Sequence, residues 1–207
     1  MAEEKSRIYE NGNYGFMVAT LNEADGTYEA AETIEGLVNV DITMSQTSSD
    51  IAADDITDYA TLIGDVTGEG TITFVGLKKA DYEKLYNAIT DNNGAIVFGK
   101  KAPPKKVGIS FFNTQNHSGG TSENKFTLNN CVFSVPNIQT QTVQKDDSTT
   151  RSFALSVKCN PYYYTDSEGK RQRVTASLLN SEEDKVIYKT AKNEIYIPDK
   201  DYASSLL

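Results

Sequence analysis

Tryptophan is absent from this 207-residue sequence, histidine occurs once, and the only cysteines are Cys131 and Cys159. Two cysteines without companions do not supply the usual zinc site. The amino-terminal decapeptide MAEEKSRIYE has no apolar core of the kind that a signal peptide carries, and no apolar run reaches the length of a membrane span. We therefore expect a chain made in a reducing cytosol, with both cysteines present as buried thiols.

Recognisable catalytic and ligand-binding motifs are also missing. The single histidine, His117, lies in the Gly- and Ser-rich stretch NTQNHSGGTSENK without a nucleophile beside it, which favours an exposed loop histidine over a catalytic base. GEG at 68–70 is not followed by the Lys-Ser/Thr of a phosphate-binding loop, and NEADG lacks the last ligand of a calcium loop. We expect no catalytic site, no metal and no cofactor.

Positive charge is scarce, because 20 Lys and Arg residues are outnumbered by 29 Asp and Glu residues and the net charge is −9. A conventional nucleic-acid-binding protein needs a basic surface against phosphate, and this composition argues against one. Glycosidase clefts usually offer tryptophan and other aromatic platforms to sugar rings, and this chain has no tryptophan to flank its acidic cluster. A solvated or collectively electrostatic face is therefore favoured over a catalytic pair or a metal site. The cluster consists of Asp50, Asp54, Asp55, Asp58, Asp65 and Glu69.

Alternation of apolar and polar residues predicts that most of the chain is β-strand. Residues 37–45 alternate cleanly, which indicates a strand exposed on one side. Its apolar face would consist of Val38, Val40, Ile42 and Met44. Asp25-Gly26 predicts a tight hairpin, the Gly-rich GDVTGEG predicts a second one, and the polar stretch 113–125 is expected to be a surface loop. Other strands are predicted over residues 14–21, 27–34, 56–63, 71–75, 95–99, 107–112, 126–135, 152–159, 174–179, 185–188 and 194–197.

Only residues 78–89 predict a helix, with Gly94 available as a left-handed cap after it. Its apolar stripe would consist of Tyr82, Leu85, Tyr86 and Ile89. A helix this short needs a sheet to lie on. We therefore predict a mainly β fold, a β-sandwich or open barrel of about ten strands with one short helix packed on a sheet. Residues 14–188 would form the β domain, with an amino-terminal arm at 1–13 and a carboxy-terminal strand and arm at 189–207.

The order of these pieces resembles that of a known family. A one-sided strand is followed by an Ala-Asp-Asp corner at 53–55, a strand, a Gly-containing turn, a second strand and a short helix. The helix has the form L-x-x-x-D-(Y/F)-x-x-L, through Leu77, Asp81, Tyr82 and Leu85. The segments VGISFF, NKFTLNNCVFSVP and TRSFALSVKCNP then follow in that order. Over about residues 15–165, the pattern resembles the major tail proteins (tail tube proteins) of long non-contractile-tailed bacteriophages, or siphophages, as found in phages of Gram-positive bacteria.

The resemblance implies a structural virion protein and not an enzyme. Six copies would form a ring, the rings would stack into a tube, and the genomic DNA would pass through the lumen during ejection without specific binding. The partners would be further copies of the chain and the terminator, distal tail and tape measure proteins, with no membrane contact. The location would be the host cytoplasm before assembly and the virion tail afterwards. Candidate lumen or ring-contact residues are Asp41, Asp54, Asp55, Asp58, Asp65 and Glu69.

Other functions are compatible with the same residues. Tube proteins of contractile tails and of secretion systems share this fold. The run PYYYTD at 161–166 would suit a carbohydrate-binding β-sandwich with Tyr162, Tyr163 and Tyr164 as its platform, although packing against the core or a neighbouring subunit is favoured. The acidic cluster would suit a hydrolase.

Overall fold

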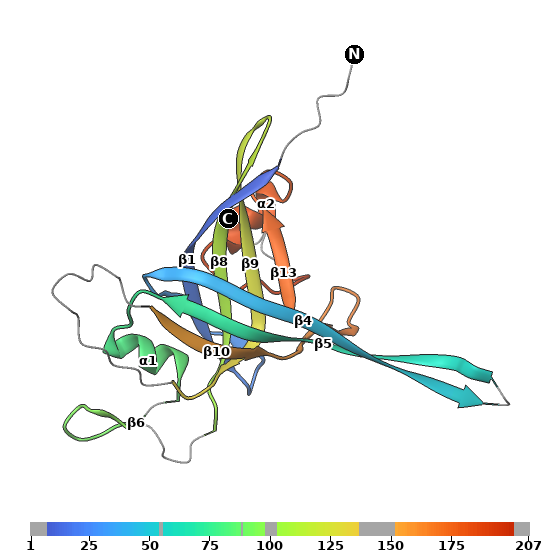
Figure 1. Ribbon diagram of the computed structural model, residues 1–207, viewed down its shortest axis with the longest axis horizontal. Coiled ribbons are helices and arrows are strands. Elements are labelled where there is room, and N and C mark those ends of the chain that lie inside the picture. Colours follow the sequence, from blue (N-terminus) through green and yellow to red (C-terminus); the bar gives the residue numbers. More distant parts are fainter. Residues whose placement is uncertain (1–7, 54–55, 88, 98–102, 137–151, 201–207) are drawn as a thin grey trace.

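The computed structural model describes residues 8–53, 56–87, 89–97, 103–136 and 152–200 (Figure 1). Within these ranges the chain is mainly β, as the sequence predicts, with a nine-stranded antiparallel sheet, two two-stranded ribbons and two short helices. The main sheet has the order β2-β1-β8-β9-β10-β5-β4, with β13 paired to β9 and β3 paired to β1. The elements are β1 (Tyr9–Asn22), β2 (Thr27–Tyr28), β3 (Glu32–Thr33), β4 (Leu37–Ala53), β5 (Ile56–Phe74), α1 (Lys79–Leu85), β6 (Ile89–Thr90), β7 (Ile96–Val97), β8 (Lys106–His117), β9 (Gly120–Phe133), β10 (Phe153–Cys159), β11 (Tyr162–Thr165), β12 (Arg171–Val174), β13 (Ala176–Asn180) and α2 (Lys185–Ala191).

Strand β9 belongs to two layers of the molecule. Its first half pairs with β13 and its last residues pair with β10. Between the two halves, Asn130 has a φ of 49° and the register with β8 shifts between Val107 and Ile109. Such an irregularity bends a strand. As a result β1, β8, β9 and β13 form one layer, the body, and β10, β5 and β4 form a second layer, the wall, which crosses the body in Figure 1.

The main apolar core lies between the body and the wall. Phe16 of β1 and Phe74 of β5 meet edge to face with their ring centroids 5.1 Å apart, and both are fully buried. Leu85 of α1 is buried in the same cluster, so the predicted helix does lie on a sheet. The helix is shorter than predicted because Tyr86 is extended, and Ile89 belongs to β6. Gly94, with a φ of 82°, completes the turn between β6 and β7 and does not cap the helix.

A second, smaller cluster lies against α2. It consists of Met17, Phe112, Leu179, Tyr188 and Ala191. The prediction of a strand at 185–188 is wrong, because this segment is the start of α2. Lys125 of β9 is fully buried beside this helix, and its Nζ donates to the carbonyl oxygens of Ala191, Lys192 and Glu194. The last carbonyl groups of a helix have no partner within it, and the buried ammonium group supplies one.

Four further sequence predictions are corrected. GDVTGEG forms no hairpin, because β5 runs without a break through it, paired to β4 on one side and, from Gly68, to β10 on the other. The polar stretch 113–125 is not a loop but the outer part of the β8–β9 hairpin, which turns at 118–119. Residues 9–13, predicted as part of an amino-terminal arm, belong to β1, and residues 194–197 form no strand.

Candidate functional site

The wall presents one polar face, made mostly of short side chains in rows across three strands. The pairing register places Asp41 beside Thr71 and Ser156, and Thr43 beside Glu69 and Lys158. None of the polar-face residues is buried. We call this surface the polar face; it consists of Asn39, Asp41, Thr43, Ser45, Thr67, Glu69, Thr71, Thr73, Ala154, Ser156 and Lys158. It is the feature that the alternation in residues 37–45 predicts.

The opposite side of the wall carries the core residues, but the sequence assigns one of them to the wrong face. The register with β5 shifts between Leu37 and Asn39. Because a shift of one residue exchanges the two faces of a strand, Leu37 packs against the core and Val38 is exposed. Val40 and Ile42 point to the core, as predicted.

Strands β4 and β5 continue far beyond the wall as a two-stranded hairpin, visible in Figure 1 as the long projection away from the body. We call residues 46–53 and 56–66 the arm. Leu62 and Ile63 are 60% and 63% exposed, and because neighbouring residues of a strand point to opposite faces, each face of the arm carries one of them. Tyr59, Ile51 and Val66 are exposed as well. An isolated two-stranded hairpin is marginally stable in water, and this one places large apolar side chains in solvent on both of its faces.

Among the described residues, the outer edge of the wall is open, because β4 forms ladder pairs with β5 only and one side of residues 37–45 has no neighbouring strand. An unprotected edge strand is a template for pairing with another chain. The polar face therefore has an edge at which a further sheet can join it.

The three predicted carboxylates whose side chains the structure describes, Asp41, Asp65 and Glu69, do not share one set of contacts. Asp41 and Glu69 lie on the polar face, where Glu69 Oε1 is 2.6 Å from the ammonium nitrogen of Lys158. Asp65 pairs instead with Arg173 of β12 and accepts a 3.4 Å hydrogen bond from Tyr163. Asp54 and Asp55 lie outside the described residues, and Asp58 lies in β5 with its side chain likewise outside the description. Asp50, on the arm, accepts a hydrogen bond of 2.7 Å from Thr61.

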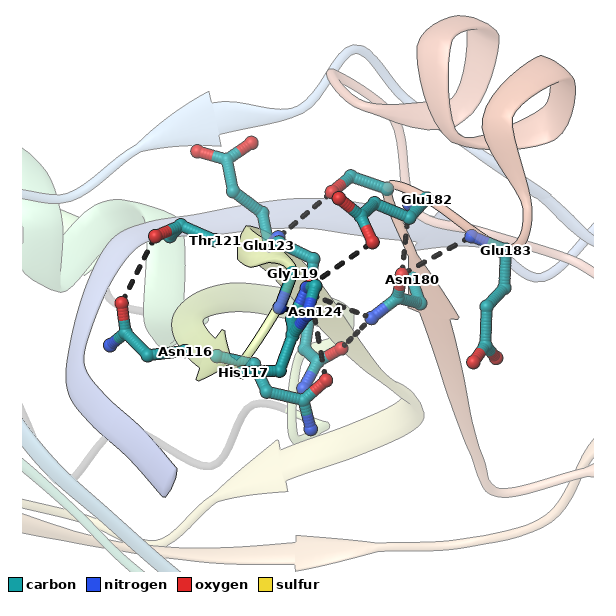
Figure 2. A network of polar contacts seen from close by, with 12 residues as sticks. Asn116, His117, Gly119, Thr121, Glu123, Asn124, Asn180, Glu182 and Glu183 are labelled. Atoms are coloured by element: carbon teal, nitrogen blue, oxygen red, sulfur yellow. Dashed lines mark hydrogen bonds and ion pairs between the residues drawn. The ribbon is translucent and has the colours of Figure 1, made fainter. Parts of the chain in front are cut away.

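His117 lies at the end of β8 within a polar network at the tip of the β8–β9 hairpin (Figure 2). Its Nε2 is 3.2 Å from Glu182, and its Nδ1 accepts a hydrogen bond from the backbone N–H of Gly119. Asn180 donates to Asn124 at 2.7 Å and accepts from the backbone of Glu182. The histidine thus fixes the hairpin tip to the segment after β13.

The three consecutive tyrosines of β11 do not form a flat platform. Tyr162 is buried against Tyr28, with ring centroids 5.5 Å apart, and its hydroxyl donates to the carbonyl of Gly26. Tyr163 is exposed on the opposite face of the strand, with the guanidinium of Arg171 4.3 Å from its ring centroid. The first ring therefore serves packing, as the sequence favours, and the second is partly covered.

Sequence reasoning missed the apolar side chains of the arm and the cation on the polar face. The sequence predicts an ordinary strand over residues 56–63, which contains Tyr59, Leu62 and Ile63. In this strand, polar residues do not alternate regularly with the apolar ones. That lack of alternation is the signal that both faces of the strand need a cover. The ion pair of Lys158 with Glu69 depends on the β5–β10 register, which no local pattern specifies.

No protein-family model matches this chain, and no match is found among curated proteins. In the part of the chain that the structure describes, no helix is long and apolar enough to cross a membrane. No group of three or more His, Cys, Asp or Glu side chains positioned to hold a metal ion occurs among the described residues.

Proposed function

We propose that this protein is the tail tube protein of a long non-contractile-tailed bacteriophage, a structural and non-enzymatic protein. Six copies form a ring, the rings stack into a tube, and the genome leaves through the lumen. The observation that carries the proposal is the combination of a one-sided polar wall with an open edge and a projecting arm that exposes apolar side chains on both faces.

The width of the wall supports a ring of six. Counting the end of β9, four strands lie side by side in the order β9-β10-β5-β4. Six such units supply 24 strands, and with a spacing of ~4.8 Å and a tilt near ~40° these enclose a barrel roughly 45–50 Å across between backbones. The short Thr and Ser side chains of the polar face keep most of that width open, which leaves room for duplex DNA.

The arm supports the stacking of rings. The arm extends beyond the edge of the body (Figure 1), so the body does not bury the side chains of Leu62 and Ile63. Exposed apolar side chains of this size do not stabilise the isolated chain. Both faces of a hairpin become buried when it lies between two neighbouring subunits. Apolar anchors of this kind dominate the energetics of protein–protein interfaces. We therefore assign the arm to contacts with adjacent copies.

Charge supports passage of DNA without adhesion. The net charge of −9 per chain gives 6 × (−9) = −54 per ring. Basic surfaces bind duplex DNA by releasing its counterions, and an acidic tube repels the phosphates instead. On the polar face, Lys158 is neutralised by Glu69 at 2.6 Å, so Asp41 is the carboxylate without a basic neighbour in the same rows.

A reconstruction of the phage particle that carries this chain tests the proposal. We expect the chain in the wall of the tail shaft, with the polar face toward the lumen and the β4 edge paired with a strand of the neighbouring copy. A map that places the chain elsewhere, or that shows the β4 edge covered by its own molecule, would contradict the proposal. Purified protein alone is the weaker test, because assembly can depend on an initiating complex.

A further inference from the structure

Cys131 and Cys159 are directly opposite each other where β9 joins the wall. They are register partners in the antiparallel β9–β10 pair. The backbone N–H of Asn160 donates to the carbonyl of Asn130 at 3.1 Å, which identifies the cysteines as a non-hydrogen-bonded pair of the ladder. In such pairs the two Cα atoms are about 4.5 Å apart, within the range of disulfide-linked residues of about 4.4–6.8 Å.

The two sulfur atoms face each other inside the core. Their separation is 2.9 Å, both residues are fully buried, and both are free thiols in this structure. A disulfide has a sulfur–sulfur length of about 2.05 Å, so an approach of roughly 0.9 Å closes the bond. Rotation about the side-chain bonds supplies a movement of this size, and neither strand has to shift.

The surroundings leave no side chain between the two sulfurs. Gly68 of β5 lies opposite Cys159, and a methyl group on Gly68 would lie 3.4 Å from the Cys159 Cβ. Buried cysteines often act only as small apolar residues. A cysteine that serves only as a small apolar residue can point its sulfur in any direction. Here the two cysteines are register partners and their sulfur atoms are in contact, which is the arrangement that a disulfide requires.

We propose that Cys131 and Cys159 form a dithiol that closes into an intrachain disulfide when the protein meets a small oxidant such as hydrogen peroxide. One thiolate attacks a peroxide oxygen, the O–O bond breaks, and a sulfenic acid and hydroxide are formed. The second sulfur attacks the sulfenic sulfur, the S–S bond forms, and the sulfenic oxygen leaves as water. Two thiols lose two hydrogen atoms in total, and one peroxide molecule is reduced to two waters. This inference is independent of the proposed function.

Burial sets the rate and the choice of oxidant. Burial, together with the hydrogen bond to Cys159, raises the pKa of the Cys131 thiol, so the reactive thiolate is rare at neutral pH. The reaction is therefore slow at neutral pH and accelerates as the pH rises. A bulky aromatic disulfide reagent does not fit into the closed core, whereas hydrogen peroxide approaches the size of water.

The bond would join the body to the wall. β9 and β10 share only three register pairs, and Cys131–Cys159 is the one nearest the bend at Asn130. A cross-link there holds the two layers together in the unfolded chain as well, which raises stability by limiting the unfolded ensemble. Oxidised protein therefore melts at a higher temperature than reduced protein, and a reducing agent reverses the difference.

The test exposes native protein to hydrogen peroxide at several pH values and then measures the intact mass and the linked peptides. We expect a loss of two hydrogen atoms, a non-reduced peptide joining Cys131 to Cys159, a higher melting temperature and reversal by dithiothreitol. The variants Cys131→Ala and Cys159→Ala serve as controls, and each should add oxygen to its remaining cysteine without a link. The proposal is overturned if native protein keeps two alkylatable thiols, gains oxygen without a linked peptide, or forms links only between chains.

Discussion

Gly70 of β5 approaches β4 so closely that a methyl group on its Cα would overlap the carbonyl oxygen of Asp41. The close approach lies in the middle of the wall, opposite Ile42. A methyl group on Gly68, two residues away, would likewise come too close to the sulfur of Met44, but this neighbour is a flexible side chain that can move. The glycines that suggest a turn in the sequence thus allow two long strands to pack closely.

The first prediction concerns this contact. Gly70→Ala forces the two strands apart and should lower the free energy of unfolding by about 1–3 kcal/mol. Gly76→Ala is the matched control, because nothing lies within 4 Å of its added methyl group, and it should be neutral or stabilising by less than about 1 kcal/mol. Urea denaturation measures both. Equal midpoints for the two variants would show that the wall tolerates a wider spacing.

The second prediction separates the arm from the fold. Leu62→Ser combined with Ile63→Ser changes only exposed side chains, so the free energy of unfolding should change by no more than about 1 kcal/mol. Assembly into tubes should be lost, because both faces of the arm lose their apolar anchors. Electron microscopy of particles or of assembled protein measures this. Val135→Ser with Val186→Ser is the control, since these exposed residues lie away from the arm.

Normal tubes from the arm variant, under conditions in which the wild-type protein assembles, would remove the arm from the interface. Loss of tubes in the control variant as well would show a general solubility effect. Only the selective loss supports the assignment of the arm.

The third prediction concerns charge on the polar face. Asp41→Lys with Glu69→Lys changes each chain from −9 to −9 + 4 = −5, and each ring from −54 to −30. It also leaves Lys158 without its partner, so the face becomes basic. Tubes should form, and DNA ejection should slow, more strongly at low salt, because phosphate contacts weaken as salt rises. Ejection from purified particles, followed by dye fluorescence, measures the rate.

Glu168→Lys with Glu183→Lys serves as the control for the third prediction, because it changes the net charge equally at residues outside the polar face. Ejection should be unaffected in this control. If both double variants slow ejection to the same extent, total charge and not the polar face is responsible; if neither does, the electrostatic role is wrong.

The fourth prediction follows from the buried Lys125. Burial lowers its pKa from 10.5 to about 8, with Glu194 opposing the shift, and this corresponds to roughly 3 kcal/mol against the charged form. Between these two pH values the unfolded chain binds more protons than the folded one, so the contribution of Lys125 to stability rises with pH from 8 toward 10.5. Below pH 8 both states are protonated and the cost is fully present. The titration of this one residue thus favours the folded state at mildly alkaline pH.

Urea midpoints measured from pH 7 to 9.5 test this sign against Lys125→Met. The variant should lose the rise with pH, and at pH 7 it leaves the carbonyls of Ala191, Lys192 and Glu194 without their donor. Tyr28 and Tyr86 limit the useful range, because burial raises their pKa values and stability falls again when the unfolded tyrosines ionise. Parallel pH profiles for the two proteins would show that Lys125 titrates normally.

The sequence specifies some of these features and not others, and the difference is physical. The alternation in residues 152–159 and 37–45 identifies both outer strands of the wall, because a strand wet on one side leaves a period of two. Gly68 and Gly70 read as turn residues because glycine permits both a turn and a close approach of strands. Which of the two occurs depends on the partner strand, and local sequence does not contain that information.

The sequence-based predictions are also wrong for a polar hairpin and for a short helix. Residues 113–125 form ladder pairs although they have almost no apolar face, because each strand satisfies the backbone groups of the other. The segment 185–191 contains Val186, Ile187 and Tyr188, which favour strands, and still forms α2 against Phe112. Tertiary contacts override such weak local preferences.

The continuity of the main sheet has a mechanical consequence. The arm, the wall and the body belong to one hydrogen-bonded sheet, from β4 through β5 and β10 to β9. Ladder hydrogen bonds lie across the strands, so a pull on the tip of the arm shears many of them at once and does not open them one at a time. A load on the arm of one molecule is therefore carried into its body through the sheet itself, without passing through a flexible connection.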